Sequence, residues 1–175
     1  QSGVSFHDRK GHTVDQPTET VDWSVEQAQK GGFPHFMIKE IFEEPDALRK
    51  TGSAHMEGEL PFFGVPSLDT DILARVRTLH IVACGTAMHA GLVGKTLIEK
   101  LARIPVNVEI ASEFRYRDPI LAEDDLVILL SQSGETADTL AALRHAKETG
   151  IRPLAIVNVV GSSVAREADE GLYTR

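Results

Sequence analysis

The segment Leu126–Leu130 consists of five consecutive apolar residues. A strand with one face in water alternates apolar and polar side chains, so an unbroken apolar run predicts a strand that is buried on both faces. Further strand-like segments occur at 79–83, 106–110 and 154–157, and another begins at Leu172. Segments with helical patterns separate these strands. This rhythm predicts an α/β fold in which a parallel sheet carries helices on both faces.

Clusters of Gly, Pro and Ser divide the rest of the chain into segments. Residues 1–24 are expected to hold a small hairpin with a turn at 7–11, and residues 18–23 are expected to form a linker. Residues 51–68 are expected to form a loop, and Pro45 is expected to kink or break the helix that contains it. The predicted helices span residues 24–30, 35–50, 68–77, 88–103, 135–149 and 162–168.

The composition excludes several classes of protein. The 175 residues include 26 Asp and Glu against 18 Lys and Arg, which gives a formal net charge of −8 and argues against bulk binding to nucleic acid or anionic membranes. Cys84 is the single cysteine, so no intrachain disulfide can form, and we expect a cytoplasmic protein. No run reaches the ~18 apolar residues of a membrane span. The seven His residues show no metal-ligand spacing, and we expect neither a metal nor a cofactor.

Short polar side chains crowd the loop that follows the longest apolar strand. Its six residues supply three hydroxyls and one amide, from Ser131, Gln132, Ser133 and Thr136, and Gly134 allows close approach of the backbone. Open parallel sheets bind ligands outside the carboxyl ends of their strands. The helix that follows offers unpaired N–H groups and about half a positive charge. We therefore expect this loop to hold a phosphate without a lysine, the alternative being that Ser133 merely caps the helix.

A second candidate loop follows the strand at 79–83. Gly85 and Thr86 open a helix there and can offer N–H groups and one hydroxyl. Cys84 is expected to be a small buried residue rather than a nucleophile, because no base is predictable beside it. His89 is expected to be exposed or packed, without a catalytic role.

Two further clusters have simpler interpretations. A charged cluster after the second strand is interpreted as a solvated helix face, with an interface or a substrate loop as the alternative; it consists of Glu113, Arg115, Tyr116, Arg117 and Asp118. Residues 161–163 are interpreted as the start of a helix.

Three segments taken together resemble one family. They are Cys84–Thr86, Ala111–Tyr116 and Ser131–Thr139. Their order and spacing are similar to those of the first sugar isomerase (SIS) domain of the glutamine–fructose-6-phosphate amidotransferases, also called glucosamine-6-phosphate synthases. Segments 31–41 and 158–163 resemble this family as well, so the resemblance covers nearly the whole chain.

The resemblance implies a flavodoxin-like three-layer sandwich whose last elements follow Arg175. It also implies that residues 1–22 are the tail of a glutaminase domain with a linker, and that residues 23–175 belong to the first SIS domain. Enzymes of this family convert fructose 6-phosphate and glutamine-derived ammonia to glucosamine 6-phosphate, as homodimers.

By the same resemblance, the sugar phosphate would contact five residues of this chain and lie close to three more. The five are Thr86, Ser131, Gln132, Ser133 and Thr136, and the three are Gly85, Ala87 and Gly134.

Two departures from the family pattern limit what the resemblance implies. The family usually has a serine where this chain has Ala87, so one hydroxyl contact to the ligand is missing or replaced. The glutaminase cysteine, the acid/base glutamate, the ring-opening histidine and the Schiff-base lysine of the family all lie outside residues 1–175. We therefore expect binding residues here but no catalytic residue, with the remainder of the polypeptide as a partner, in the same chain or a separate one.

Other SIS proteins remain as alternatives. A non-catalytic sugar-phosphate sensor would share the loop at 131–136, but it would not be expected to carry the segment at 31–41 after a hairpin. A related SIS isomerase or deaminase would lack the glutaminase-like tail.

Overall fold

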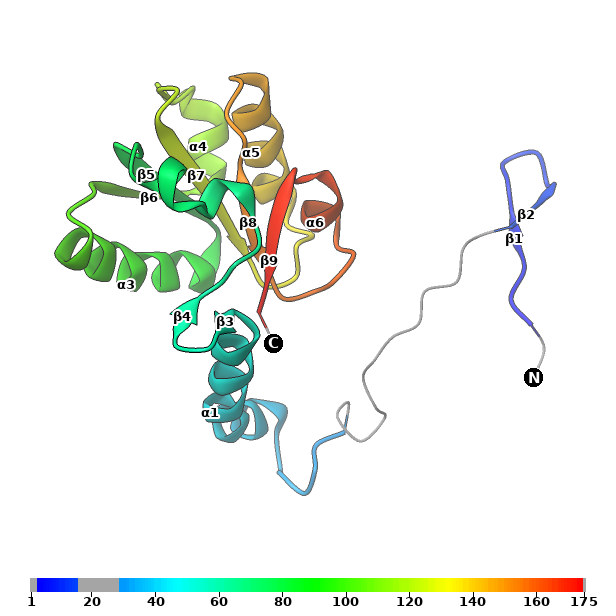
Figure 1. Ribbon diagram of the computed structural model, residues 1–175. Coiled ribbons are helices and arrows are strands. Elements are labelled where there is room, and N and C mark those ends of the chain that lie inside the picture. The colour runs from blue at the N-terminus through cyan, green and yellow to red at the C-terminus, as the bar shows by residue number, and fades with distance from the viewer. Residues whose placement is uncertain (1–2, 16–28, 175) are drawn as a thin grey trace. The chain divides into compact units, whose positions relative to one another are not determined.

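The computed structural model describes residues 3–15 and 29–174 (Figure 1). The chain divides into two units, residues 1–44 and 45–175, and each is described by itself. The linker predicted at 18–23 lies outside the described residues, and so does most of the helix predicted at 24–30.

The first unit contains the predicted hairpin. Strand β1 (Phe6–His7) pairs antiparallel with β2 (Thr13–Val14). The carboxylate of Asp8 accepts hydrogen bonds from the backbone N–H groups of Lys10, at 2.8 Å, and His12, at 2.9 Å. These bonds close the turn, because an Asp side chain readily binds backbone groups two to four residues ahead.

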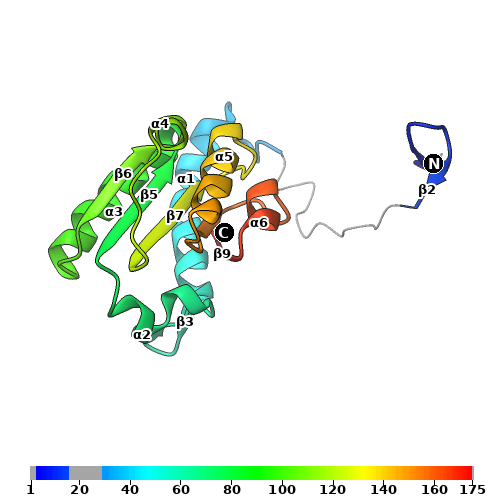
Figure 2. The ribbon, with the colours of Figure 1, turned by 90° about the horizontal axis from the view of Figure 1, so that it is seen from above.

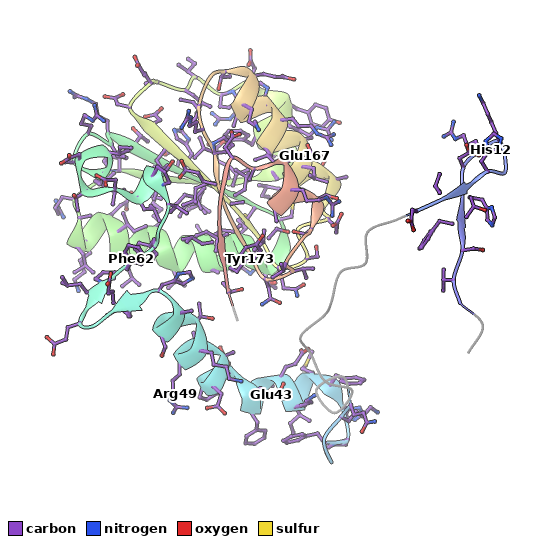
Figure 3. The ribbon with its side chains drawn as sticks, turned by 45° about the vertical axis from the view of Figure 1, so that its right-hand side comes forward. His12, Glu43, Arg49, Phe62, Glu167 and Tyr173 are labelled. Atoms are coloured by element: carbon purple, nitrogen blue, oxygen red, sulfur yellow. The ribbon has the colours of Figure 1, made fainter. Side chains whose placement is uncertain are left out.

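Helix α1 (Phe36–Ala54) is longer than predicted and contains Pro45 without a break (Figure 3, where Glu43 and Arg49 are labelled on this helix). Of the two predicted outcomes, a kink or a break, the break is wrong, because the helix continues through Pro45. Proline has no backbone N–H and therefore removes one intrahelical hydrogen bond.

The loop predicted at 51–68 is wrong in part. It contains the last turn of α1, the short hairpin of β3 (Met56–Glu57) and β4 (Leu60–Pro61), and the 3-10 helix η1 (Pro66–Leu68). Helix α2 (Thr70–Leu73) follows and is shorter than predicted. The side chain of Asp69 caps it by accepting the N–H of Asp71.

The second unit is built on the predicted parallel sheet. Its five strands run side by side in the order β6-β5-β7-β8-β9, and every neighbouring pair is parallel. The strands are β5 (Thr78–Ala83), β6 (Val106–Ile110), β7 (Asp125–Ser131), β8 (Leu154–Val157) and β9 (Glu170–Tyr173). The apolar run of β7 occupies the centre, which explains why it lacks alternation.

Helices cover both faces of the sheet, as the sequence predicts (Figures 1 and 2). Helix α3 (Gly85–Leu101) covers one face, where Leu79, Ile81 and Leu126 form a core with Ile98 of the helix. Helices α4 (Ala111–Arg117) and α5 (Ala137–Glu148) cover the other face, around Phe114, Leu129 and Leu143. The short α6 (Ser163–Glu167) packs beside α5 on β8.

Helix α3 contacts the sheet through Gly91 as well as through Ile98. Gly91 is buried, and a Cβ atom on it would lie 2.9 Å from Cγ2 of Ile81. The apolar side chains that the sequence places on one side of this helix are exposed, with exposed fractions between 45% and 77%; they are Leu92, Val93, Leu97 and Leu101.

Candidate functional site

The strand order creates a switch point between β5 and β7. From β5 the chain crosses over α3, on one face, to β6. From β7, on the other side of β5, it crosses over α5, on the opposite face, to β8. The loops that leave these two adjacent strands diverge, and the crevice between them is where doubly wound sheets bind their ligands.

The loop after β5 has an open helix start. Helix α3 begins at Gly85 rather than at the predicted Met88. Gly85 has a φ of +57°, a left-handed conformation that glycine adopts without a steric penalty. Cys84 is the N-cap residue and makes no capping hydrogen bond through its side chain, while Thr86 is exposed in the first turn. The first N–H groups of α3 therefore have no side-chain cap, and Thr86 lies beside them in the first turn.

The loop after β7 is folded by its own hydroxyls. Ser131 is the last residue of β7, is buried, and accepts the backbone N–H of Gly134 at 3.0 Å. Gly134 has a φ of +65°, and Ser133 accepts the N–H of Glu135 at 3.3 Å. A hydroxyl that accepts a hydrogen bond still has its own proton to donate. The folded loop can therefore offer two serine O–H donors to a ligand.

Helix α5 begins at Ala137, two residues later than predicted. Its N-cap residue is Thr136, whose side chain makes no capping hydrogen bond. The interpretation that Ser133 merely caps this helix is therefore wrong. Helices α2 and α6, by contrast, are capped by the side chains of Asp69 and Ser162. Helices α3, α4 and α5 all begin without a side-chain cap, and of these α3 and α5 begin in the loops that flank the switch point.

The two candidate loops lie next to each other. Their strands pair in register from Leu79 opposite Leu126 to Ala83 opposite Leu130, so both loops begin at the same level of the sheet. The hydroxyl of Thr139, in the first turn of α5, lies 3.9 Å from the sulfur of Cys84. Cys84 is partly buried and packs against the core, which agrees with a structural role.

A third segment, which follows β8, completes the site, although no motif in the sequence predicted a ligand contact there. The backbone carbonyl of Gln132 accepts N–H groups from Asn158 and Val159, both at 3.3 Å. The side-chain amide of Gln132 donates to Oδ1 of Asn158 at 3.4 Å, and Asn158 in turn donates to the carbonyl of Thr174 at 3.2 Å. The loops after β7 and β8 therefore run side by side below the sheet in Figure 1. The resemblance of residues 158–163 to the family was the one signal that pointed to this segment.

Charges around the α5 amino end are paired. Asp138 lies in the first turn of α5, and Arg115 of α4 donates to its carboxylate at 3.0 Å. The charged cluster at 113–118 thus lies on the exposed side of α4 and at its end, as interpreted. The guanidinium group of Arg115 reaches from it to α5. Glu135 is exposed, and the hydrogen bonds from the Ser163 side chain and backbone, with the nearby charge of Arg166, hold its pKa below the usual range.

A hollow of about 770 Å³ lies at the opposite, amino end of the strands, near Asp125 and Arg152. Its lining carries three carboxylates, from Glu123, Asp124 and Asp125, against the two guanidinium groups of Arg75 and Arg152. An excess of carboxylates disfavours a phosphate. The physical chemistry therefore favours the carboxyl ends of the strands, rather than this hollow, as the ligand site.

Within residues 3–15 and 29–174, no three His, Cys, Asp or Glu side chains gather in a group that could hold a metal ion. No helix in these residues is long and apolar enough to cross a membrane.

Comparison with known proteins agrees with this geometry. A family model described as "SIS domain" matches residues 72–175. The glutamine–fructose-6-phosphate aminotransferase (isomerizing) of Clostridium acetobutylicum is 53% identical over 173 residues, which cover 98% of this chain and 28% of that protein. The chain therefore spans less than a third of the length of the curated relatives it matches.

Solved structures extend the comparison to the fold. The C-terminal domain of glucosamine-fructose-6-phosphate aminotransferase from Francisella tularensis matches with a TM-score of 0.77 and 40% identity, over 84% of this chain and 41% of that one. The sugar isomerase domain of an RpiR transcription factor from Sphaerobacter thermophilus matches with a TM-score of 0.58 and 20% identity, over 77% and 74% of the two chains, which shows a shared fold alone. The SIS family model matches more than half of this chain, and the chain folds into a five-stranded parallel sheet. The chain therefore belongs to the SIS domain family.

Proposed function

We propose that this chain binds the phosphorylated sugar in a glutamine–fructose-6-phosphate aminotransferase of the isomerizing type. The observation that carries the proposal is the loop of Ser131, Ser133 and Thr136, whose hydroxyls lie at a helix start that has no side-chain cap. The identity to the Clostridium acetobutylicum enzyme, over nearly the whole chain, supports the same conclusion.

The phosphate of fructose 6-phosphate would lie at the amino end of α5. The three hydroxyls would donate to its oxygens, and the helix N–H groups would supply about half a positive charge. Thr86, across the switch point, and Gln132 would contact the same ligand. Ala87 has no hydroxyl to contribute.

Such an anchor serves catalysis from a distance. The phosphate lies far from C1 and C2, where a ketose becomes an aldose, so binding energy gained at the phosphate positions the reacting carbons. Residues 1–22 would end a glutaminase domain that supplies ammonia, and residues 23–175 would form the first SIS domain. The acid/base groups would come from sequence outside residues 1–175, and the enzyme would work as a homodimer.

Substitutions in the loop test this proposal. Ser131→Ala and Thr136→Ala should each weaken the binding of fructose 6-phosphate to the full-length protein by about 1–3 kcal/mol, because each removes a hydrogen bond to a charged acceptor. Calorimetric titration measures the dissociation constant. Fructose, which lacks the phosphate, should show no binding at the same concentrations.

Thr96→Ala is a suitable control, because Thr96 is exposed on α3 and its hydroxyl donates only to the carbonyl of Leu92. It should bind fructose 6-phosphate as the unaltered protein does. Unchanged affinity in both Ser131→Ala and Thr136→Ala would contradict the assignment of the loop, and equal binding of fructose would contradict the phosphate anchor.

A further inference from the structure

The loop from Ser131 to Thr136, called the ligand loop below, is hydrogen-bonded to the amino end of α6 through two adjacent residues. The carbonyl of Gly134 accepts the backbone N–H of Val164 at 2.9 Å. The carboxylate of Glu135 accepts the backbone N–H of Ser163 at 2.8 Å. Both donors belong to the first turn of α6, whose N–H groups have no partners within the helix. The loop therefore closes the start of a helix that lies 28 residues further along the chain.

The contact at this junction is close. A Cβ atom on Gly134 would lie 2.1 Å from the hydroxyl oxygen of Ser162, whose residue is only 2% exposed. Nothing larger than glycine fits between the loop and the α6 cap. The loop therefore has no room to shift toward α6. The hydrogen bond from Ser163 to the Glu135 carboxylate keeps it from moving away from α6.

Glu135 is also the only charged residue in the loop from Ser131 to Thr136. A free carboxylate beside a phosphate would oppose binding, because like charges repel. Here the Glu135 carboxylate accepts a hydrogen bond from Ser163, and the positive charge of Arg166 lies near it. Arg166 itself is fixed by hydrogen bonds to the carbonyl of Gly161 and to the hydroxyl of Ser163.

We propose that Glu135 is a positioning residue for sugar-phosphate binding: by holding the start of α6 it keeps the hydroxyls of Ser133 and Thr136, on either side of it, at the amino end of α5. This inference rests on the proposed function of the loop. Glu135 itself does not contact the ligand. Its carboxylate acts through the loop backbone, and its charge is held on the α6 side.

Three substitutions of Glu135 separate the effects of its hydrogen bond to Ser163, its negative charge and its side-chain length. In Glu135→Gln an amide oxygen still accepts the N–H of Ser163, so the dissociation constant for fructose 6-phosphate should stay within about threefold of the original. Glu135→Ala removes the acceptor and should weaken binding by about tenfold. Glu135→Asp keeps the charge but is one methylene shorter, and it should weaken binding in the same way.

Glu148→Ala is the matched control. Glu148 is exposed in the last turn of α5, away from the loop, and its loss removes the same charge. It should leave the affinity unchanged. Hydrogen exchange of the ligand-free full-length protein gives a second measurement, because the Ser163 amide should lose protection in Glu135→Ala and keep it in Glu135→Gln.

The outcomes distinguish this inference from the proposed function. If Ser131→Ala and Thr136→Ala weaken binding but Glu135→Ala does not, the loop assignment stands and the positioning role is overturned. Tighter binding in Glu135→Gln and Glu135→Ala would mean that the carboxylate opposes the phosphate, which also overturns it. If Glu135→Ala fails to fold, Glu135→Asp takes its place, and an affinity equal to that of the unaltered protein would refute the proposal.

Discussion

At the scale of single residues, Gly134 meets two demands at once. Its φ of +65° is strained for any residue with a Cβ atom, and that atom would lie 2.5 Å from Cβ of Ser162. Gly134→Ala should therefore lower the free energy of unfolding by about 2–4 kcal/mol, as both strain and overpacking are introduced. Gly150→Ala is the control. Gly150 has a φ of +84°, but a Cβ atom on it would have no atom within 4 Å. Its substitution should lower the free energy of unfolding by only about 1–2 kcal/mol.

Urea unfolding measures the free energy of unfolding of both variants. The difference between their losses is the cost of the steric contact with Ser162. In a Ser162→Gly background the blocking side chain is gone, so Gly134→Ala should then cost no more than Gly150→Ala. Equal losses for the two variants in the original background would show that α6 does not press on the loop.

At the scale of elements, helix α3 sets the position of Thr86 through two glycines that behave differently. A Cβ atom on Gly91 would lie 2.9 Å from Ile81 and 3.3 Å from Val108, whereas one on Gly94 would lie 3.8 Å from Ile81, an ordinary contact. Gly91→Ala should destabilise the protein by about 1–3 kcal/mol. Gly94→Ala should stabilise it by about 0.5–1 kcal/mol, because alanine favours the helix.

Thermal unfolding compares this pair within one helix. Because Gly91→Ala pushes α3 away from β5, it should also weaken binding of fructose 6-phosphate, while Gly94→Ala should not. Destabilisation of the same size in both variants would contradict the close packing of α3 on the sheet.

At the scale of the whole molecule, acid should destabilise the protein through carboxylates whose pKa is lowered in the folded state. Hydrogen bonds from Arg144 and its charge hold the pKa of Glu167 below the usual 4.5, and Ser163 does the same for Glu135 (Glu167 is labelled in Figure 3). A carboxyl whose pKa is lower in the folded state stabilises that state fully above its unfolded pKa. This stabilisation is lost as the pH falls from about 4.5 through the lower folded values.

Urea unfolding at a series of pH values from 7 to 3 (roughly the range in which carboxyls titrate) tests this expectation. The free energy of unfolding should fall below pH 4.5, and the fall should be shallower in Glu167→Gln, which has no proton to gain there. An identical pH profile in Glu167→Gln would exclude the Arg144–Glu167 pair as a source of the acid sensitivity.

Much of the sheet, and the candidate loop at 131–136, could be predicted from local sequence chemistry. The apolar run at 126–130 has to be buried on both faces, which already requires neighbouring strands and two layers of helices. The hydroxyls after it stand out because they are contiguous, so Ser131, Ser133 and Thr136 could be named from the sequence. Their role as ligand contacts remains a prediction.

The helix starts and the partners of the loop depend on contacts between distant segments. Thr136, rather than Ser133, became the N-cap residue because Gly134 turns the chain toward Val164 before α5 can begin. The engagement of Glu135 with Ser163, and of Gln132 with Asn158, joins residues 26 or more positions apart. A local pattern carries no record of such pairs, because they form only when parallel strands bring successive loops to the same edge of the sheet.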